Sequence, residues 1–173
     1  MITKENLQKT EEICKQYLFA YYSGFAYRHT INMLDILNEL SEDSNEYTKN
    51  LRMDIMIFSI WLHDIGRSIE EKNHAKISYE LLLKTKIVLD DEDLRIVEDC
   101  ICNHSSNGQP LSEEAKLVQD IDKASMLEKD VLIEYIYHLS KETTLKEFVA
   151  QLTKQILKIR KFHYNNKFIL EYI

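Results

Sequence analysis

A histidine and an aspartate stand side by side at the end of a strongly apolar segment of the chain. The sequence IMIFSIWLHDIG, residues 55–66, places His63 and Asp64 directly after a run of large apolar side chains. An unpaired carboxylate is costly to bury, so Asp64 demands a cation, a hydrogen-bond network or a shifted pKa. A divalent metal ion meets these demands, and the neighbouring imidazole can share the ion although adjacent helical residues diverge by about 100°. Two ligands do not complete a coordination sphere, so further ligands are expected from other helices.

Three further histidines share a helical repeat with apolar residues. His29, His74 and His104 are each spaced three or four residues from large apolar side chains, which places them on the buried faces of their helices. A core histidine satisfied by hydrogen bonds gives the same pattern. His163 also lies in line with apolar residues but has no neighbouring motif, so periodicity alone does not separate a ligand from a packed histidine.

The elements that carry these residues are predicted to be helices. Only three glycines and one proline occur in 173 residues, and these residue types punctuate hairpins and sheet bulges. An interruption is expected near Ser23 and Gly24, Gly66 lies where a C-terminal helix cap is common, and Ser112 is a plausible helix start. The apolar periodicity predicts no strand, and it predicts helices at 4–22, 27–40, 47–64, 74–86, 91–104, 113–127, 129–140 and 143–170.

Length and composition indicate one all-α domain. A chain of 173 residues suits a single core, and no linker or repeat divides it. Cys14, Cys100 and Cys102 form no disulfide framework, as expected of free thiols in a reducing compartment. No segment approaches the roughly 20 apolar residues of a membrane helix, and the first residues contain no apolar signal-peptide segment. We therefore expect a cytoplasmic protein.

The charge balance excludes some partners. Lysine and arginine total 22 against 29 acidic residues, a net charge of -7, and no basic stripe is dense enough to follow a phosphate backbone. Neither duplex nucleic acid nor a membrane surface is expected as a partner. A small phosphorylated ligand remains compatible with this charge, because a bound cation can reverse the local field.

The order of these histidines and aspartates resembles that of a known family. His29, the pair His63 and Asp64, and Asp122 within VQDIDKASML follow one another as in the HD-domain superfamily of metal-dependent phosphohydrolases, which is named for that pair. The resemblance covers about residues 24–128. It implies a helical bundle of the HD-domain type. The chain is expected to form one such domain over residues 1–173, whose C-terminal helices in 129–173 pack on the motif core or offer a homodimer surface.

The resemblance also implies a ligand set. The residues that match the metal ligands are His29, His63, Asp64 and Asp122. Asp120 competes for the last position, but two acids two residues apart on one helix cannot both face one ion. Asp122 shares a face with Val118 and Ser125, and the family places its ligand directly before a basic residue, here Lys123. Asp122 is therefore the preferred ligand.

Two more histidines match positions that line the pocket in several subgroups. Relatives use the residues equivalent to His74 and His104 to bind substrate phosphate, or to hold a second metal bridged by the central aspartate. One ion per chain is expected rather than two, because His104 is followed by Ser105 and not by the second histidine of binuclear relatives. Imidazole and carboxylate ligands together favour Mn, Fe, Co, Ni or Zn over calcium.

The activity implied by the resemblance is phosphoester hydrolysis by a metal-activated water. A divalent ion lowers the pKa of its water and polarises a phosphoryl oxygen. Phosphoryl transfer concentrates negative charge, so we expect Arg67 and Lys123 to act in substrate binding and, with Asp64, in catalysis. Glu70 and Glu71 could orient the attacking water. The expected substrate is a small phosphorylated metabolite, namely a nucleotide with a phosphomonoester or pyrophosphate bond.

Other functions remain open on this fold. Arg67 stands where cyclic-dinucleotide enzymes commonly have lysine, and their GYP signature is absent, so that activity is disfavoured. A non-catalytic sensory module would bind a metal or a ligand without turnover. A diiron oxygenase or a hydratase is the third alternative, and the oxygenase would require two irons per chain.

Overall fold

Helices make up most of the chain that the structure describes. A computed structural model describes residues 1–42 and 47–126, followed by residues 133, 136–137, 144–160, 164–166 and 169. No strand occurs in these ranges, which confirms the all-α prediction. The α-helices are α1 (Lys4–Leu18), α2 (Phe25–Glu42), α3 (Met53–Leu62), α4 (His74–Leu83), α5 (Asp91–Asn103), α6 (Glu113–Ser125) and α8 (Leu145–Arg160). Three short 3-10 helices separate some of them: η1 (Tyr21–Gly24), η2 (Thr48–Asn50) and η3 (Ile65–Ser68).

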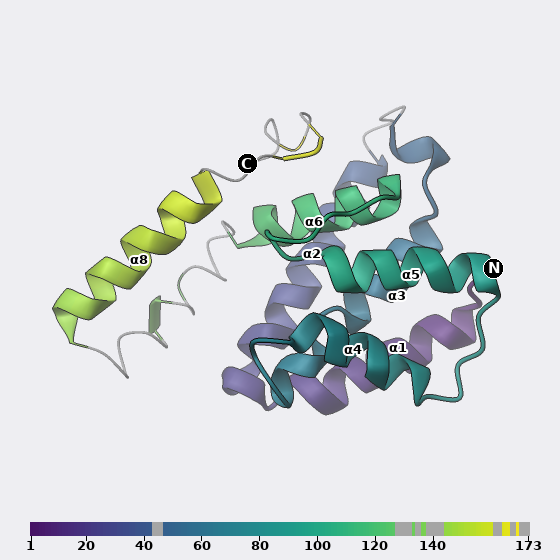
Figure 1. Ribbon diagram of the computed structural model, residues 1–173, viewed down its shortest axis with the longest axis horizontal. Helices are drawn as coiled ribbons and strands as arrows, with labels where there is room; N and C mark the ends of the chain where they lie inside the picture. The colour runs from purple at the N-terminus through teal and green to yellow at the C-terminus, as the bar shows by residue number, and fades with distance from the viewer. Residues whose placement is uncertain are drawn as a thin grey trace.

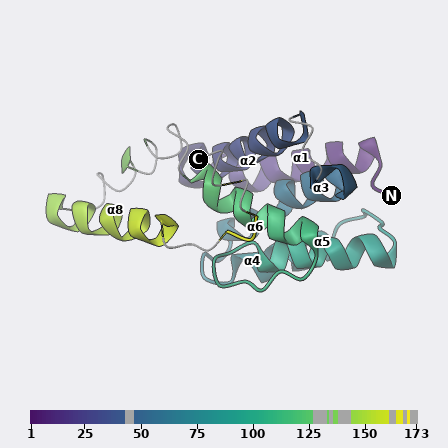
Figure 2. The same ribbon diagram turned by 90° about the horizontal axis from the view of Figure 1, so that it is seen from above.

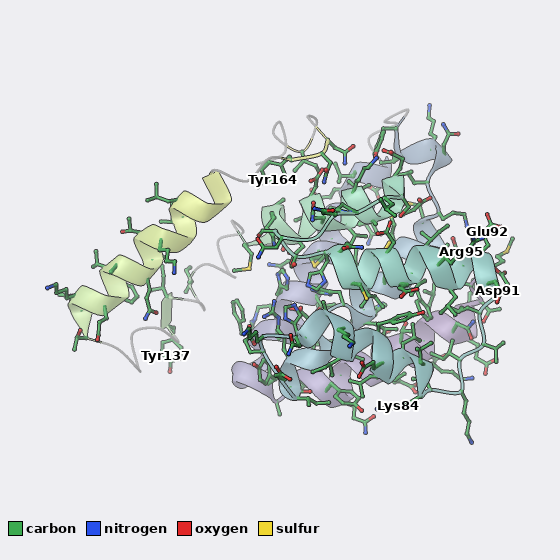
Figure 3. The ribbon with its side chains drawn as sticks, in the orientation of Figure 1. Lys84, Asp91, Glu92, Arg95, Tyr137 and Tyr164 are labelled. Carbon is green, nitrogen blue, oxygen red and sulfur yellow. The ribbon has the colours of Figure 1, made fainter. Side chains whose placement is uncertain are left out.

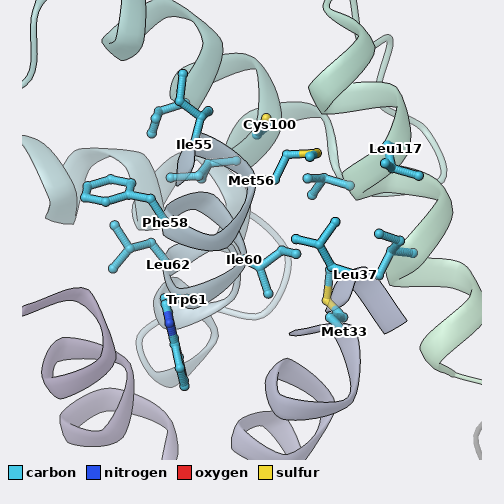
Figure 4. Close-up of a cluster of buried hydrophobic side chains, with 14 of the residues drawn as sticks. Met33, Leu37, Ile55, Met56, Phe58, Ile60, Trp61, Leu62, Cys100 and Leu117 are labelled. Atoms are coloured by element: carbon cyan, nitrogen blue, oxygen red, sulfur yellow. The ribbon is translucent and has the colours of Figure 1, made fainter. Parts of the chain in front are cut away.

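Helix α3 lies at the centre of the bundle that α1 to α6 form (Figure 1). It packs against α1, α2, α5 and α6, while α4 packs against α5 and η3. Side chains on every side of α3 are buried, as expected of a helix that is apolar all round. Figure 4 shows this cluster, in which Phe58 and Leu62 of α3 lie with Leu37 of α2, Cys100 of α5 and Leu117 of α6.

The first helix ends earlier than its predicted limit at residue 22. Thr3 caps its start by accepting a hydrogen bond from Asn6 N at 3.1 Å, and Thr10, Cys14 and Leu18 form its buried stripe. The chain then turns through η1, where Gly24 has a φ of 89°. Glycine adopts this left-handed conformation at little cost. The predicted interruption before α2 is thereby confirmed.

The predicted helix over residues 47–64 is wrong in its first turns, because α3 begins only at Met53. Arg52 leaves the helical region with φ -80° and ψ 85°. Its backbone N–H donates to Glu114 Oε1 at 3.1 Å, and its guanidinium pairs with Asp54 and, at 2.9 Å, with Asp93 of α5. Contacts with α5 and α6 therefore replace the local helical hydrogen bonds at this point.

Side-chain caps fix the starts of α5 and α6. Asp90 accepts a hydrogen bond from Asp93 N, and Ser112 accepts one from Ala115 N at 3.2 Å, as predicted for a helix starting at Ser112. Asp99 of α5 accepts from the backbone N–H of Leu111 and from both the N–H and the hydroxyl of Ser112. The turn between the two helices is thus fastened to α5.

Gly66 has a different role from the predicted helix cap. Helix α3 already ends at Leu62, and Gly66 lies inside η3. Its N–H donates to Ser78 Oγ of α4 at 2.9 Å, and a Cβ at this position would lie 2.2 Å from the carbonyl oxygen of His74. The cap prediction is wrong because the glycine is required by the close approach of α4, which begins at His74.

The C-terminal part differs from the single helix predicted over residues 143–170. Helix α8 ends at Arg160, and Tyr164, Asn165 and Asn166 are not helical. The backbone N–H groups of Asn165 and Asn166 donate to the Asp120 carboxylate instead of to helix carbonyls. Figure 2 shows α8 extending away from the bundle. His163 and most of the predicted helix at 129–140 lie outside the described residues.

Candidate metal centre

Six buried side chains converge between the helices of the bundle. They come from the second turn of α2, the residues directly after α3 and α5, the start of α4 and the last turn of α6. Each residue is at most 9% exposed, so the core positions predicted for the histidines on α2, α4 and α5 are confirmed. The six are His29, His63, Asp64, His74, His104 and Asp122.

Two overlapping groups of ligand atoms form within this set. In the first, His29, His63 and Asp64 bring their ligand atoms within 4.8 Å of one another. His63 Nε2 lies 3.4 Å from Asp64 Oδ2. His29 Nε2 lies 3.0 Å from Asp122 Oδ1, so the acid from α6 joins this group through His29.

The second group uses the other oxygen of the same aspartate. Asp64 Oδ1 lies 3.2 Å from His74 Nε2 and 3.4 Å from His104 Nε2. The two histidines also meet directly, with their Nε2 atoms 3.1 Å apart. Asp64 is therefore shared between the two groups.

Main-chain carbonyls fix the orientation of three imidazole rings. The Nδ1 atoms of His63, His74 and His104 each lie 2.7 Å from the carbonyl oxygen three residues earlier in the chain. A carbonyl oxygen only accepts, so Nδ1 carries the proton in all three rings. Each ring therefore turns its Nε2 toward Asp64, and in a neutral ring that atom carries the lone pair that a metal-binding histidine needs.

A serine orients the fourth ring in the same sense. The Ser125 hydroxyl donates to the Asp122 carbonyl at 3.0 Å, so its oxygen accepts from His29 Nδ1, also at 3.0 Å. His29 Nε2 then faces Asp122 Oδ1 at 3.0 Å. Sequence reasoning placed Ser125 on the same face as Asp122 but gave it no role in the site.

The charges inside the site call for a cation. Burial lowers the pKa of both His74 and His104, which keeps their rings neutral and leaves two lone pairs facing each other. Within the described residues, His63 Nε2 and Asp64 Oδ1 make no hydrogen bond although both are buried. Buried polar atoms without partners are uncommon and need an explanation. Imidazole nitrogens and carboxylate oxygens together suit Mn, Fe, Co, Ni or Zn.

Both carboxylates are ionised despite their burial. Burial raises the pKa of Asp64, but Arg67 and His63 hold that pKa well below its ordinary value. Burial acts in the same direction on Asp122, and Lys123 and His29 hold its pKa well below the ordinary value too. The site therefore contains two anionic side chains.

Two cationic side chains border these carboxylates. Arg67 Nε lies 2.6 Å from Asp64 Oδ2, and the guanidinium also pairs with Glu71, whose other oxygen accepts from the Tyr21 hydroxyl. Lys123 pairs with Asp122. Arg67 is only one quarter exposed and Lys123 still less. The structure thus brings both predicted cations to the edge of the cluster.

These six residues fall inside a known domain. The family model described as HD domain matches residues 26–127. The chain belongs to the HD domain family. Comparison with curated proteins and with solved structures gave no match. Members of the HD domain family are commonly metal-dependent phosphohydrolases, which agrees with the donor set of the two groups.

The structure separates the two aspartates of α6 in this HD domain. Asp122 contacts His29, whereas both carboxylate oxygens of Asp120 accept hydrogen bonds from Asn165 and Asn166. Asp120 therefore lies outside both groups of ligand atoms.

Other predicted participants in the HD domain take different positions. Glu70 accepts from the Asn73 side chain at an exposed position, while Glu71 contacts Arg67 and also supplies the carbonyl that holds His74. Of the two acids considered for orienting water, only Glu71 is linked to the site by described contacts. None of the described helices is long and apolar enough to cross a membrane.

Proposed function

We propose that this HD domain hydrolyses a phosphomonoester or pyrophosphate bond of a small phosphorylated metabolite, a nucleotide, with the help of a divalent ion. The observation that carries the proposal is the orientation of the imidazole rings. Hydrogen bonds at Nδ1 turn the Nε2 atoms of His63, His74 and His104 toward the ionised Asp64 inside the bundle. A set of lone pairs directed at one buried carboxylate is costly unless a cation joins it.

The residues proposed to hold the ion are His29, His63, Asp64 and Asp122. A bound divalent ion would supply a water of lowered pKa as nucleophile and would polarise a phosphoryl oxygen. The chain contributes the fixed direction of each ligand, because the carbonyls of Ile60, Glu71 and Ile101 and the Ser125 hydroxyl hold the four rings. Such outer partners commonly change metal affinity or activity 10- to 100-fold.

The second group favours two ions over the single ion expected from the sequence. His74 Nε2 and His104 Nε2 face each other at 3.1 Å, and both lie beside Asp64 Oδ1. Two neutral acceptors and one carboxylate oxygen form a donor set for a cation of their own. We therefore propose that Asp64 bridges two positions, and that substrate phosphate approaches from the side of Arg67 and Lys123.

Arg67 and Lys123 are proposed to bind the transferred phosphoryl group. Each is paired with a carboxylate of the cluster, and each retains some exposure to solvent. Charge on the phosphoryl oxygens rises in the transition state, and cations held beside it stabilise that charge. The planar guanidinium of Arg67 can contact two phosphate oxygens at once, while Lys123 provides a point charge.

The proposal is tested by substrate turnover with a matched pair of variants. Protein loaded with Mn²⁺ is incubated with a panel of nucleoside mono-, di- and triphosphates, and released phosphate and pyrophosphate are measured. Asp64→Asn removes the shared charge without changing side-chain size, whereas Asp35→Asn changes an exposed acid on the helix that carries His29. We expect turnover in the wild type and in Asp35→Asn, and its loss in Asp64→Asn.

Two results would contradict the proposal. Undiminished hydrolysis by Asp64→Asn would show that a contaminant or another site is responsible. Binding of Mn²⁺ with strong thermal stabilisation but no turnover of any nucleotide would instead support the non-catalytic module, since a ligand that binds only the folded state stabilises it.

A further inference from the structure

A glutamine on α6 connects the site to the turn that carries His104. Gln119 is 4% exposed, and its side-chain Nε2 donates to the carbonyls of Asn103 at 2.9 Å, Ser105 at 2.8 Å and Gly108 at 3.3 Å. Asn103 and Ser105 are the two neighbours of His104 in the chain. One amide group therefore holds the main chain on both sides of this histidine.

The other end of the same amide is held by the C-terminal segment. Gln119 Oε1 accepts from Asn165 Nδ2 at 3.1 Å. The donor and acceptor atoms of an amide occupy opposite positions, so this contact keeps Nε2 directed at the turn around His104. Asn165 itself is exposed.

The next residue of α6, Asp120, makes more hydrogen bonds to the same C-terminal residues. Asp120 is fully buried, and its two oxygens accept four hydrogen bonds of 2.8–3.0 Å from the backbone and side-chain N–H groups of Asn165 and Asn166. Residues two apart on an α-helix project about 200° apart. Asp120 therefore accepts hydrogen bonds from Asn165 and Asn166 on one face of α6, while Asp122 faces His29 on the other.

The C-terminal residues reach this position from far along the chain. Asp120 and Asn165 are 45 residues apart, and α8 lies between them in sequence and away from the bundle in space (Figures 1 and 2). In the view of Figure 3, the Tyr164 label lies near α6, whereas the Tyr137 label lies below α8. Ile169, beyond the two asparagines, is fully buried in the core. Residues 164–166 and Ile169 are thus anchored to the bundle.

We propose that Gln119, held by Asn165, is a positioning residue for His104, and that the hydrogen bonds from Asn165 and Asn166 to Asp120 position Asp122. The C-terminal segment then sets the geometry of both ligand groups without contacting an ion or a substrate. This inference deepens the proposed function and rests on it for its catalytic meaning. The coupling itself concerns side chains of the chain alone.

The test compares histidine ring signals in Gln119→Met, Asn165→Ala and Asn107→Ala. Nitrogen-15 NMR of the imidazole rings is recorded at one pH in full-length protein without added metal, and Mn²⁺ affinity is then measured by titration. Gln119→Met removes the amide at similar length, and Asn165→Ala changes an exposed residue and should leave folding intact. Asn107→Ala, exposed in the same turn as His104, is the matched control.

We expect the ring signals of His104 to shift in Gln119→Met and, in the same direction, in Asn165→Ala, with Mn²⁺ affinity lowered about 10-fold in both. Asn107→Ala should match the wild type in both measurements. Unchanged His104 signals in folded Asn165→Ala would overturn the proposal. This readout is separate from nucleotide hydrolysis, so a wild type without turnover would refute the proposed function while the NMR comparison still decides the coupling.

Discussion

Replacing Gly66 by alanine should damage the fold and the site together. A Cβ at this position would lie 2.2 Å from the His74 carbonyl oxygen and 2.8 Å from Ser78 N, both of them main-chain atoms of α4. Ordinary contact begins near 3.4 Å, so α4 would have to move away by about 1 Å. Because His74 is the first residue of α4, the movement would also withdraw its ring from Asp64.

The expected cost follows from the packing and from one hydrogen bond. Overpacking a close contact costs about 1–3 kcal/mol, and weakening the buried bond from Gly66 N to Ser78 Oγ adds about 1 kcal/mol. We expect the free energy of unfolding to fall by about 3 kcal/mol, which corresponds to a melting temperature lower by about 6–12 °C in a chain of this size.

Urea unfolding of Gly66→Ala and Gly24→Ala provides the assay. Gly24 has a positive φ, but its added Cβ would meet only the Phe19 carbonyl at 3.5 Å, so alanine there should cost about 1 kcal/mol of backbone strain. Gly66→Ala should also bind fewer Mn²⁺ ions than Gly24→Ala. Equal stability of the two variants, with unchanged metal binding, would refute the close-approach explanation.

Three further predictions follow from burial and charge. Burial raises the pKa of the Cys14 thiol to about 12, above its ordinary value. The stabilisation from keeping this thiol protonated should be complete below about pH 8.5 and fall as pH rises, by up to about 1.4 kcal/mol per pH unit. Urea unfolding from pH 8 to 11 should show a smaller fall in Cys14→Ala than in the wild type. Phe58→Ala should lower the free energy of unfolding by about 3–5 kcal/mol, because Phe58 is fully buried. Phe19 is 66% exposed, so Phe19→Ala should lower it by less than about 0.5 kcal/mol. Equal losses of the two variants in thermal unfolding would contradict the packing described. Arg67→Gln removes the cation beside Asp64 and should weaken inhibition by inorganic phosphate about 10- to 100-fold; an unchanged inhibition constant would remove Arg67 from the phosphate site.

Local patterns were sufficient to predict most helices and the burial of three histidines, whereas the set of converging ligands was implied by the resemblance to the HD-domain superfamily. The apolar repeats around His29, His74 and His104 lie within single helices, so the sequence shows directly that these side chains face the core. A carboxylate such as Asp64 in an apolar segment signals a buried charge for the same reason. The predicted limits failed where a partner from a distant helix decides the conformation, as at Arg52, which binds Asp93 of α5.

The groups that orient the site residues could not be predicted, because they carry no sequence signal. The carbonyl that holds His104 belongs to Ile101, and any residue three positions earlier would supply the same atom. Sequence reasoning separated Asp120 from Asp122 by helix geometry but could not name Asn165 as its partner 45 residues away. Gly66 looked like a cap because its neighbour in space, α4, is not apparent from local spacing.

The metal content of the protein tests the central claim most directly. Protein purified without chelator or affinity histidines, then reloaded with Mn²⁺, is compared with Asp64→Asn and His104→Ala by counting ions per chain. Because Asp64 is shared by both groups, we predict about two ions in the wild type, one in His104→Ala and none in Asp64→Asn. A wild type that binds no ion after reloading, or an Asp64→Asn variant that binds as many as the wild type, would contradict the account.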